Sequence, residues 1–134
     1  MHKFWRRKKE QSENTTELVK AELTPQQKKK RKKHGKSILQ DQSCKQCFLC
    51  MLLEGDFREK PVQDHHVFYG SGRRQISEEQ GFKVNLCLRH HIDGAEAVHQ
   101  NRNYDRMLKR MCQQVYELDH SHEDFLGLFH EDFR

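Results

Sequence analysis

Two pairs of adjacent histidines mark the centre of the chain, in Asp64-His65-His66-Val67 and in Leu86-Cys87-Leu88-Arg89-His90-His91. The second pair closes a Cys-x2-His step, and a Cys-x2-Cys step lies upstream at Cys47 and Cys50. Cysteine and neutral histidine are common protein ligands of zinc and of other borderline metals. The pattern therefore indicates that metal binding organises this part of the chain.

Four of these residues have the spacing of a closed structural zinc site. Cys47 and Cys50 would supply one half, and Cys87 and His90 the other, as C-x2-C followed by C-x2-H. Cys44 stands one further Cys-x2-Cys step upstream and remains an alternative to Cys47 or Cys50. We favour Cys47 and Cys50 because apolar residues lie between and after them. The other interpretation is that these cysteines are ordinary buried thiols.

The composition limits the size of the core. The chain has 134 residues, of which 34% are hydrophobic and 34% are charged. Small domains are short of buried apolar area, and a bound metal can supply the missing stability. We find no signal-peptide pattern and no run long enough to span a membrane, so we expect a cytoplasmic protein without membrane contact. In that compartment clustered cysteines bind metal more often than they form disulfides.

The positive charge lies at the front of the chain. Residues 1–40 contain 13 Lys/Arg against four Asp/Glu, whereas residues 41–134 contain 12 against 16. We interpret 1–43 as a basic, low-complexity arm that is mostly disordered, and 44–134 as the metal-binding domain. The arm is a candidate for contacts to nucleic-acid phosphates, and the alternative is a solvated tail. The candidate phosphate-binding residues are Lys28, Lys29, Lys30, Arg31, Lys32 and Lys33.

The sequence pattern predicts an α+β fold for this domain. Residues 61–69 lean towards a strand, and the alternation over 82–86 predicts a second, half-buried strand. A short helix over 76–81, ended by Gly81, lies in the insertion between the two strands.

Two helices are expected after the second histidine pair. The apolar positions between Ala95 and Tyr116 follow a helical period, which predicts a long amphipathic helix with Cys112 in its buried stripe. Ser121 begins a last helix with a start that resembles a capping box.

The histidines outside the zinc set are His65, His66, His91 and His99. Neighbouring side chains on a strand point to opposite faces, so His65 and His66 cannot chelate one ion side by side. One can bind a metal while the other accepts a proton from water. A metal ion together with a neutral imidazole is suited to hydrolysis of a phosphodiester. The alternative for each residue is a structural histidine.

The stretch from about Cys47 to Asn101 resembles the HNH endonucleases, most closely the small HNH-type proteins of phages and prophages. That family has an Asp-His or His-His pair on its first strand, followed by a Leu-Cys-x2-Cys-His step that leads into a helix. The counterparts here are His65-His66 and the segment from Leu86 to His91, in which His90 replaces the second cysteine. The resemblance implies a zinc-stapled ββα-metal core, similar to a treble clef, with C-terminal helices as an extension.

The resemblance also implies roles for individual residues. His66 would be the general base, and His65 and His91 would bind a catalytic divalent ion such as Mg²⁺, Mn²⁺, Ni²⁺ or Zn²⁺. The family's third ligand often follows about one helical turn after His91, where this chain has Ala95, so His99 is the next candidate. Structural Zn²⁺ would be held by Cys47, Cys50, Cys87 and His90.

The family's Asn, about five residues before the knuckle cysteine, is replaced here by Phe82, and Asn85 is nearby. Arg73 and Arg74 in the insertion are candidates to hold backbone phosphates of the nucleic acid, or are plain surface charges. The implied function is a metal-dependent DNA endonuclease or nickase that serves a phage or prophage. The alternatives are a non-catalytic zinc module that binds nucleic acid and, third, a small protein–protein adaptor.

Overall fold

The computed structural model describes residues 33–134, and Lys33–Arg134 form one compact unit. Within it the predicted α+β class is confirmed: five helices accompany a sheet of two strands. The candidate contacts Lys28 to Lys32 lie outside the described residues. The elements in chain order are α2 (Phe48–Glu54), β1 (Gln63–His66), α3 (Arg73–Gln80), β2 (Lys83–Leu86), α4 (Leu88–His91), α5 (Arg102–Asp119) and α6 (His122–Phe129).

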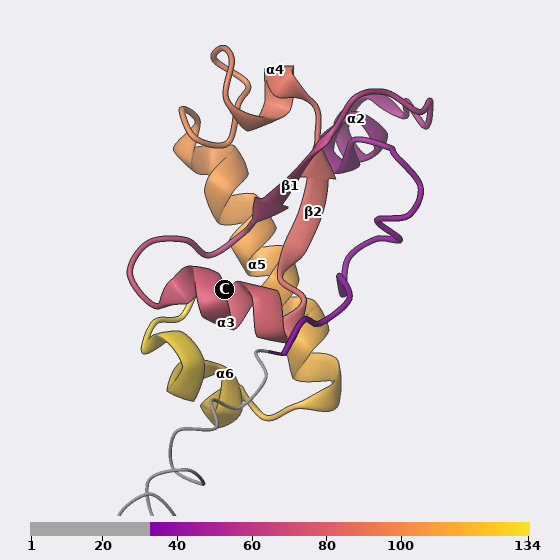
Figure 1. The fold of residues 1–134 in the computed structure, drawn as a ribbon. Coiled ribbons are helices and arrows are strands. Elements are labelled where there is room, and N and C mark those ends of the chain that lie inside the picture. Colours follow the sequence, from indigo (N-terminus) through magenta and orange to yellow (C-terminus); the bar gives the residue numbers. More distant parts are fainter. Residues whose placement is uncertain (1–32) are drawn as a thin grey trace, which may run out of the picture. The chain divides into compact units, whose positions relative to one another are not determined.

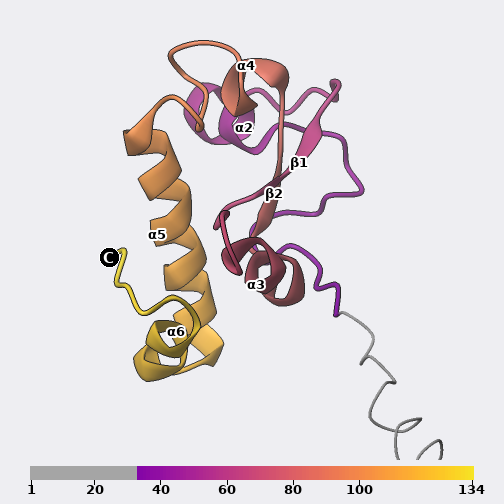
Figure 2. The ribbon, with the colours of Figure 1, turned by 60° about the vertical axis from the view of Figure 1, so that its left-hand side comes forward.

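The two strands form an antiparallel pair that carries the first histidine pair. In their register His65 lies opposite Val84, and His66 lies opposite Lys83. Opposite residues of an antiparallel pair share a face of the sheet, whereas successive residues alternate. Because of this alternation, His65 and His66 point to opposite faces of the sheet, as predicted. Helices α2 and α4 lie at one end of the strands, and α3 lies at the other end (Figures 1 and 2).

An aromatic cluster forms much of the core beneath the strands. It contains five buried phenylalanines, and the rings of Phe68 and Phe129 stack with centroids 4.0 Å apart. Burying one such side chain contributes about 1.5–3 kcal/mol. Cys112 on α5 is fully buried beside this cluster, as predicted. The five members are Phe68, Phe82, Phe125, Phe129 and Phe133.

The C-terminal helices differ from the prediction only at the start of α5. The expected helix from Ala95 is wrong over residues 95–101, which form turns, and α5 begins at Arg102. Gly94 adopts φ 110°, and the Asn101 side chain accepts hydrogen bonds from the first turn of α5. Val98 is buried although it lies outside any helix. The helical spacing of apolar residues therefore continued into a segment that forms turns. The capping box at Ser121 is confirmed.

The second strand is more buried than expected. All four residues of β2 are buried, although the alternation predicted a half-buried strand. The segment 37–44 covers the polar face: Ser37 donates to the Lys83 carbonyl, and the Asn85 amide donates to the carbonyl oxygens of Gln42 and Cys44. Residues 33–43, which we expected in the arm, thus belong to the compact unit.

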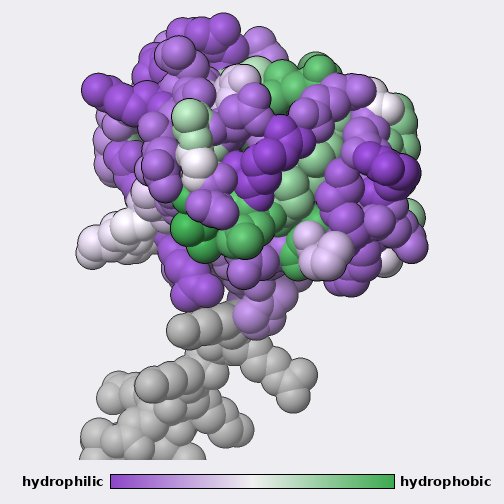
Figure 3. All heavy atoms as spheres, turned by 90° about the horizontal axis from the view of Figure 1, so that it is seen from above, coloured by the Kyte–Doolittle hydropathy of each residue, from purple (hydrophilic) through white to green (hydrophobic). Residues whose placement is uncertain are grey.

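The surface near α2 and α4 carries several exposed apolar side chains. They are Leu52, Leu53, Phe57, Leu88 and Ile92. The view onto this end of the domain shows apolar patches interrupted by hydrophilic side chains (Figure 3). Among residues 33–134, no helix combines the length and the apolar character that crossing a membrane requires.

Substitution of two glycines with similar backbone angles tests whether the segment before Cys44 packs against Gly81. Gly81 has φ 78°, and an added Cβ would collide with the Lys36 carbonyl. Gly55 has φ 63°, and its Cβ would meet nothing within 4 Å. We expect Gly55→Ala to cost about 1–2 kcal/mol of unfolding free energy for the left-handed conformation. Gly81→Ala should cost about 2–5 kcal/mol, because overpacking is added. Denaturant unfolding of both variants measures the two losses of unfolding free energy. Equal losses would contradict close packing of the Lys36 carbonyl against Gly81.

Candidate metal sites

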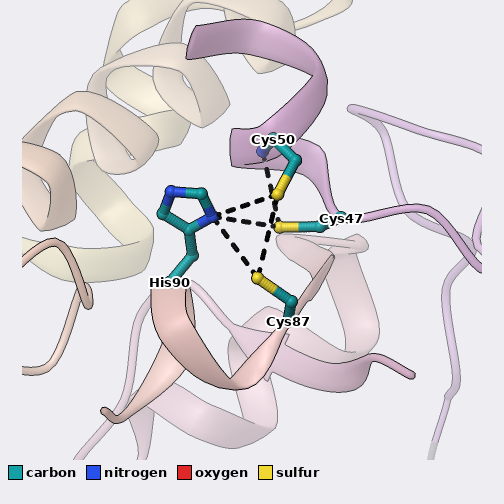
Figure 4. A group of neighbouring side chains, drawn as sticks. All are labelled: Cys47, Cys50, Cys87 and His90. Carbon is teal, nitrogen blue, oxygen red and sulfur yellow. Dashed lines mark hydrogen bonds between the residues drawn. The ribbon is translucent and has the colours of Figure 1, made fainter. Parts of the chain in front are cut away.

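The zinc ligands predicted from the sequence come from two turns at the same end of the strands. Cys47 is the N-cap of α2, and its sulfur accepts a hydrogen bond from the Cys50 amide. Cys87 is the N-cap of α4, one residue after β2 ends. His90 lies on α4 and is 1% exposed. The four side chains point towards one centre (Figure 4).

The distances between the donor atoms fit a tetrahedral ion. His90 Nδ1 lies 3.4 Å from the sulfur of Cys47, 3.4 Å from that of Cys50 and 3.5 Å from that of Cys87. The sulfurs of Cys50 and Cys87 are 3.8 Å apart. Ordinary zinc bonds of about 2.3 Å to sulfur and about 2.0 Å to nitrogen place tetrahedral donors about 3.8 Å (S–S) and about 3.5 Å (S–N) apart. The cluster can therefore hold a structural metal such as zinc.

The geometry of the cluster decides whether its cysteines form a disulfide and whether Cys44 takes part. A separation of 3.8 Å between sulfurs is far too long for a disulfide, whose bond is about 2.05 Å. Cys44 is exposed and lies outside the four-residue cluster. Burial, followed by the neighbouring Cys47 thiol, raises the pKa of Cys50 to about 12. A metal that binds here must displace that proton, since the thiolate is the ligand.

A second cluster joins His65, His91 and His99. One ligand atom from each residue lies within 4.8 Å of the others. The ring centroids of His65 are 5.0 Å from His91 and 5.1 Å from His99, and the last two rings are 4.9 Å apart. His65 is 2% exposed, while His99 is exposed. The structure therefore brings together the three residues that we expected to bind a catalytic ion.

The loop after α4 creates this convergence. Val98 N donates to the His90 carbonyl, and His99 N donates to the His91 carbonyl. The chain thus folds back on α4 across the turn at Gly94, whose φ of 110° favours glycine. A continuous helix is not needed to place His99 beside His91.

One ring nitrogen of His65 has no hydrogen-bond partner among residues 33–134. This atom, Nε2, is buried, and an unsatisfied polar atom is costly in a protein interior. Burial, with smaller contributions from His91 and His99, lowers the pKa of His65 to about 3, so the imidazole is neutral. A neutral ring with a free nitrogen has the form in which histidine binds metals.

Gln63, which the sequence did not single out, orients a neighbouring ring. Its Oε1 lies 2.7 Å from His91 Nδ1 and accepts the ring N–H. His91 Nε2 is then the nitrogen available to an ion. Gln63 lies two residues before His65 and so shares its face of β1. The only signal in the sequence was this spacing, because Gln63 carries no charge and belongs to no motif.

His66 lies on the opposite face of the sheet and has different partners. Its Nε2 is 3.0 Å from a carboxylate oxygen of Glu78 on α3. The same carboxylate pairs with Lys83 and with His34, each at 3.0 Å. The predicted general base is thus separated from the three clustered histidines by the alternation of β1. Glu78 was not predicted, because nothing in the sequence placed the insertion next to His66.

Other predicted residues lie elsewhere. Arg73 pairs with Glu131 at 3.2 Å and its guanidinium lies over the Phe129 ring, so a partner within the domain already holds it. Arg74 and Lys33 are exposed. Phe82, at the position of the family's Asn, is a fully buried core residue. Asn85 supplies hydrogen bonds between β2 and the covering segment.

Comparisons with protein-family models, with curated proteins and with solved structures find no match for this chain.

We predict that the purified chain retains one tightly held zinc ion through Cys47, Cys50, Cys87 and His90. Replacing Cys87 by Ala should remove this zinc and lower the unfolding temperature, because the ion fastens α2 to the β2–α4 turn. Metal analysis of the dialysed protein, with Cys44→Ser as the matched control, measures the effect. Loss of zinc from the Cys44 variant, or full zinc content in the Cys87 variant, would contradict the assignment.

Proposed function

We propose that the chain is a metal-dependent DNA endonuclease or nickase with an HNH-type ββα-metal core, and that it serves a phage or prophage. One observation carries the proposal: one ligand atom each of His65, His91 and His99 lies within 4.8 Å of the others. His65 Nε2 has no hydrogen-bond partner among residues 33–134, and a second histidine, His66, follows on the same strand. This arrangement combines a cation site with a proton acceptor.

The finer fold is supported by the order of the elements. Two antiparallel strands are followed directly by α4, and the Cys47–Cys50 turn faces the Cys87–His90 turn across the zinc cluster. A knuckle that fastens a hairpin to the following helix is what a treble-clef-like ββα-metal core requires. The helix α3, inserted between the strands, is the main addition to that plan.

The donor set of the histidine cluster suits a divalent transition metal. Imidazole nitrogens bind Zn²⁺, Ni²⁺ and related ions readily, and the His65 Nε2 atom is free to bind such an ion. A divalent ion held by His65, His91 and His99 would stabilise negative charge on a phosphodiester and on its leaving oxygen. The Gln63 side chain keeps His91 in the tautomer that offers Nε2.

His66 has the complementary task of accepting the proton of the attacking water. Within residues 33–134, β1 pairs only with β2, so its other edge has no strand partner, and we propose that the substrate binds there. Adjacent Cα atoms are about 3.8 Å apart, so a phosphodiester at this edge can meet side chains from both faces. General-base catalysis by a positioned histidine contributes typically about 10²–10⁴-fold.

A second candidate is a zinc module that binds nucleic acid without cutting it. The observation that favours it is the buried Phe82, which stands where the family has its Asn. The basic residues between Lys28 and Lys33 would supply phosphate contacts in either case. Cleavage activity separates the two proposals.

The nuclease proposal predicts cleavage of plasmid DNA with added Mg²⁺, Mn²⁺ or Ni²⁺. We expect His66→Ala to lower the cleavage rate by about 10²–10⁴-fold while DNA affinity and zinc content stay unchanged. His120→Ala is the matched control. His99 lies before the start of α5 and His120 lies just after its end, and this 18-residue helix is roughly 27 Å long. His120 is therefore far from the histidine cluster. Cleavage by the His66 variant at the wild-type rate contradicts the catalytic role. DNA binding without cleavage by wild type favours the zinc module.

The cation site predicts a second bound metal ion. Titration calorimetry with Ni²⁺ on the zinc-loaded chain should show one further site, and His65→Ala should remove it. Gln63→Ala should weaken that site by about 10–100-fold, because the His91 ring loses the acceptor that fixes its orientation. Gln75→Ala is the control, because the Gln75 side chain on α3 donates to Glu79 and contacts neither cluster. Unchanged Ni²⁺ affinity in the Gln63 variant would contradict the orienting role.

A further inference from the structure

The inserted helix α3 brings one carboxylate to His66. Glu78 lies in the last turn of α3 and reaches back to the end of β1, where Oε2 is 3.0 Å from His66 Nε2. The side chain of His66 is 14% exposed and that of Glu78 is 24% exposed. The contact is therefore largely shielded from water, and it joins the insertion to the proposed general base.

Two further residues hold the carboxylate in place. Lys83 Nζ lies 3.0 Å from the same Oε2, and His34 Nδ1 lies 3.0 Å from Oε1. The backbone supports the same geometry, because Gly35 N donates to the Glu78 carbonyl. Hydrogen bonds from His34, and then from Lys83 and His66, lower the pKa of Glu78 to about 2 despite its burial. At neutral pH Glu78 is thus an anion that only accepts hydrogen bonds.

This fixes which nitrogen of His66 carries the proton. An ionised carboxylate cannot donate, so the 3.0 Å contact requires an N–H on Nε2 of His66. In the neutral ring the lone pair is then on Nδ1. Asp64 and His66 also lie near Glu78 in a group that could hold a cation, but the Lys83 ammonium already occupies the carboxylate. We therefore interpret the group as a hydrogen-bond network.

We propose that Glu78 is the positioning residue of the general base: it holds the His66 ring with Nε2–H towards α3 and presents Nδ1 as the proton acceptor. The inference rests on the proposed nuclease function. In the step, an O–H bond of the attacking water breaks and its proton bonds to Nδ1. The water oxygen bonds to phosphorus as the P–O bond to the leaving oxygen breaks.

Kinetics test the positioning role. Glu78→Ala should lower kcat about 10–100-fold with KM within about twofold, since the ring orientation is lost but the substrate contacts remain. Glu78→Gln keeps an oxygen that can accept from Nε2 and should restore most of kcat. In a His66→Ala background, Glu78→Ala should have no further effect, because Glu78 acts through His66. Glu79→Ala, the neighbouring acidic residue of α3, controls for the loss of charge. Additive effects in the double variant overturn the proposal.

Tautomer measurement tests the same contact without cleavage. Long-range proton–nitrogen NMR of the zinc-loaded full chain, well above the ordinary histidine pKa of about 6.5, identifies the protonated nitrogen of His66. We expect Nε2–H in wild type and in Glu78→Gln, and a shift towards Nδ1–H in Glu78→Ala. Nδ1–H in wild type, or an unchanged tautomer in Glu78→Ala, overturns the proposal. If wild type cuts no DNA, the nuclease proposal fails, and these spectra alone decide whether Glu78 fixes the ring.

Discussion

The convergence of three cysteine sulfurs and one histidine nitrogen fastens together the end of the domain that contains α2 and α4. It joins the first turn of α2 to the turn between β2 and α4, two segments about 40 residues apart in the chain. The donor–donor distances given for these atoms are 3.4–3.8 Å, which suits a metal ion at their centre. With His90 fixed in this way, the direction of His91 is also fixed, because it is the next residue of α4.

Strand alternation then separates the two histidines of β1. His65 is directed towards α4 and the following loop, where His91 and His99 lie. His66 is directed towards α3, where Glu78 lies. Each ring meets a different environment: one is buried with a nitrogen that lacks a partner, and the other is fixed by a carboxylate. A single dipeptide thereby supplies two imidazoles in distinct environments, which is the arrangement that the proposed cation-assisted hydrolysis uses.

The additions to the expected plan support this separation. The insertion between the strands forms α3 and supplies Glu78, and the segment beginning at His34 closes over the same face. Gln63 and Glu78 each accept a hydrogen bond from one of the proposed functional histidines, on opposite faces of β1. Each is proposed to act through its partner ring and not as a ligand of an ion. They determine which nitrogen of the partner ring remains available.

The sequence alone determined the α+β class, the Cys-x2-Cys and Cys-x2-His steps that build the zinc cluster, and the alternation of His65 and His66, because short fixed spacings and strand geometry are local properties. It also located the helix start at Ser121 and the buried Cys112. Only the tertiary structure excluded Cys44 from the zinc cluster and showed that residues 95–101, where a helix was expected, form turns. It also placed His99 beside His91 through backbone hydrogen bonds across Gly94. It alone assigned Gln63 and Glu78 their partners. These contacts join residues 12 to 28 positions apart, and their geometry depends on how loops fold back, which no local periodicity encodes.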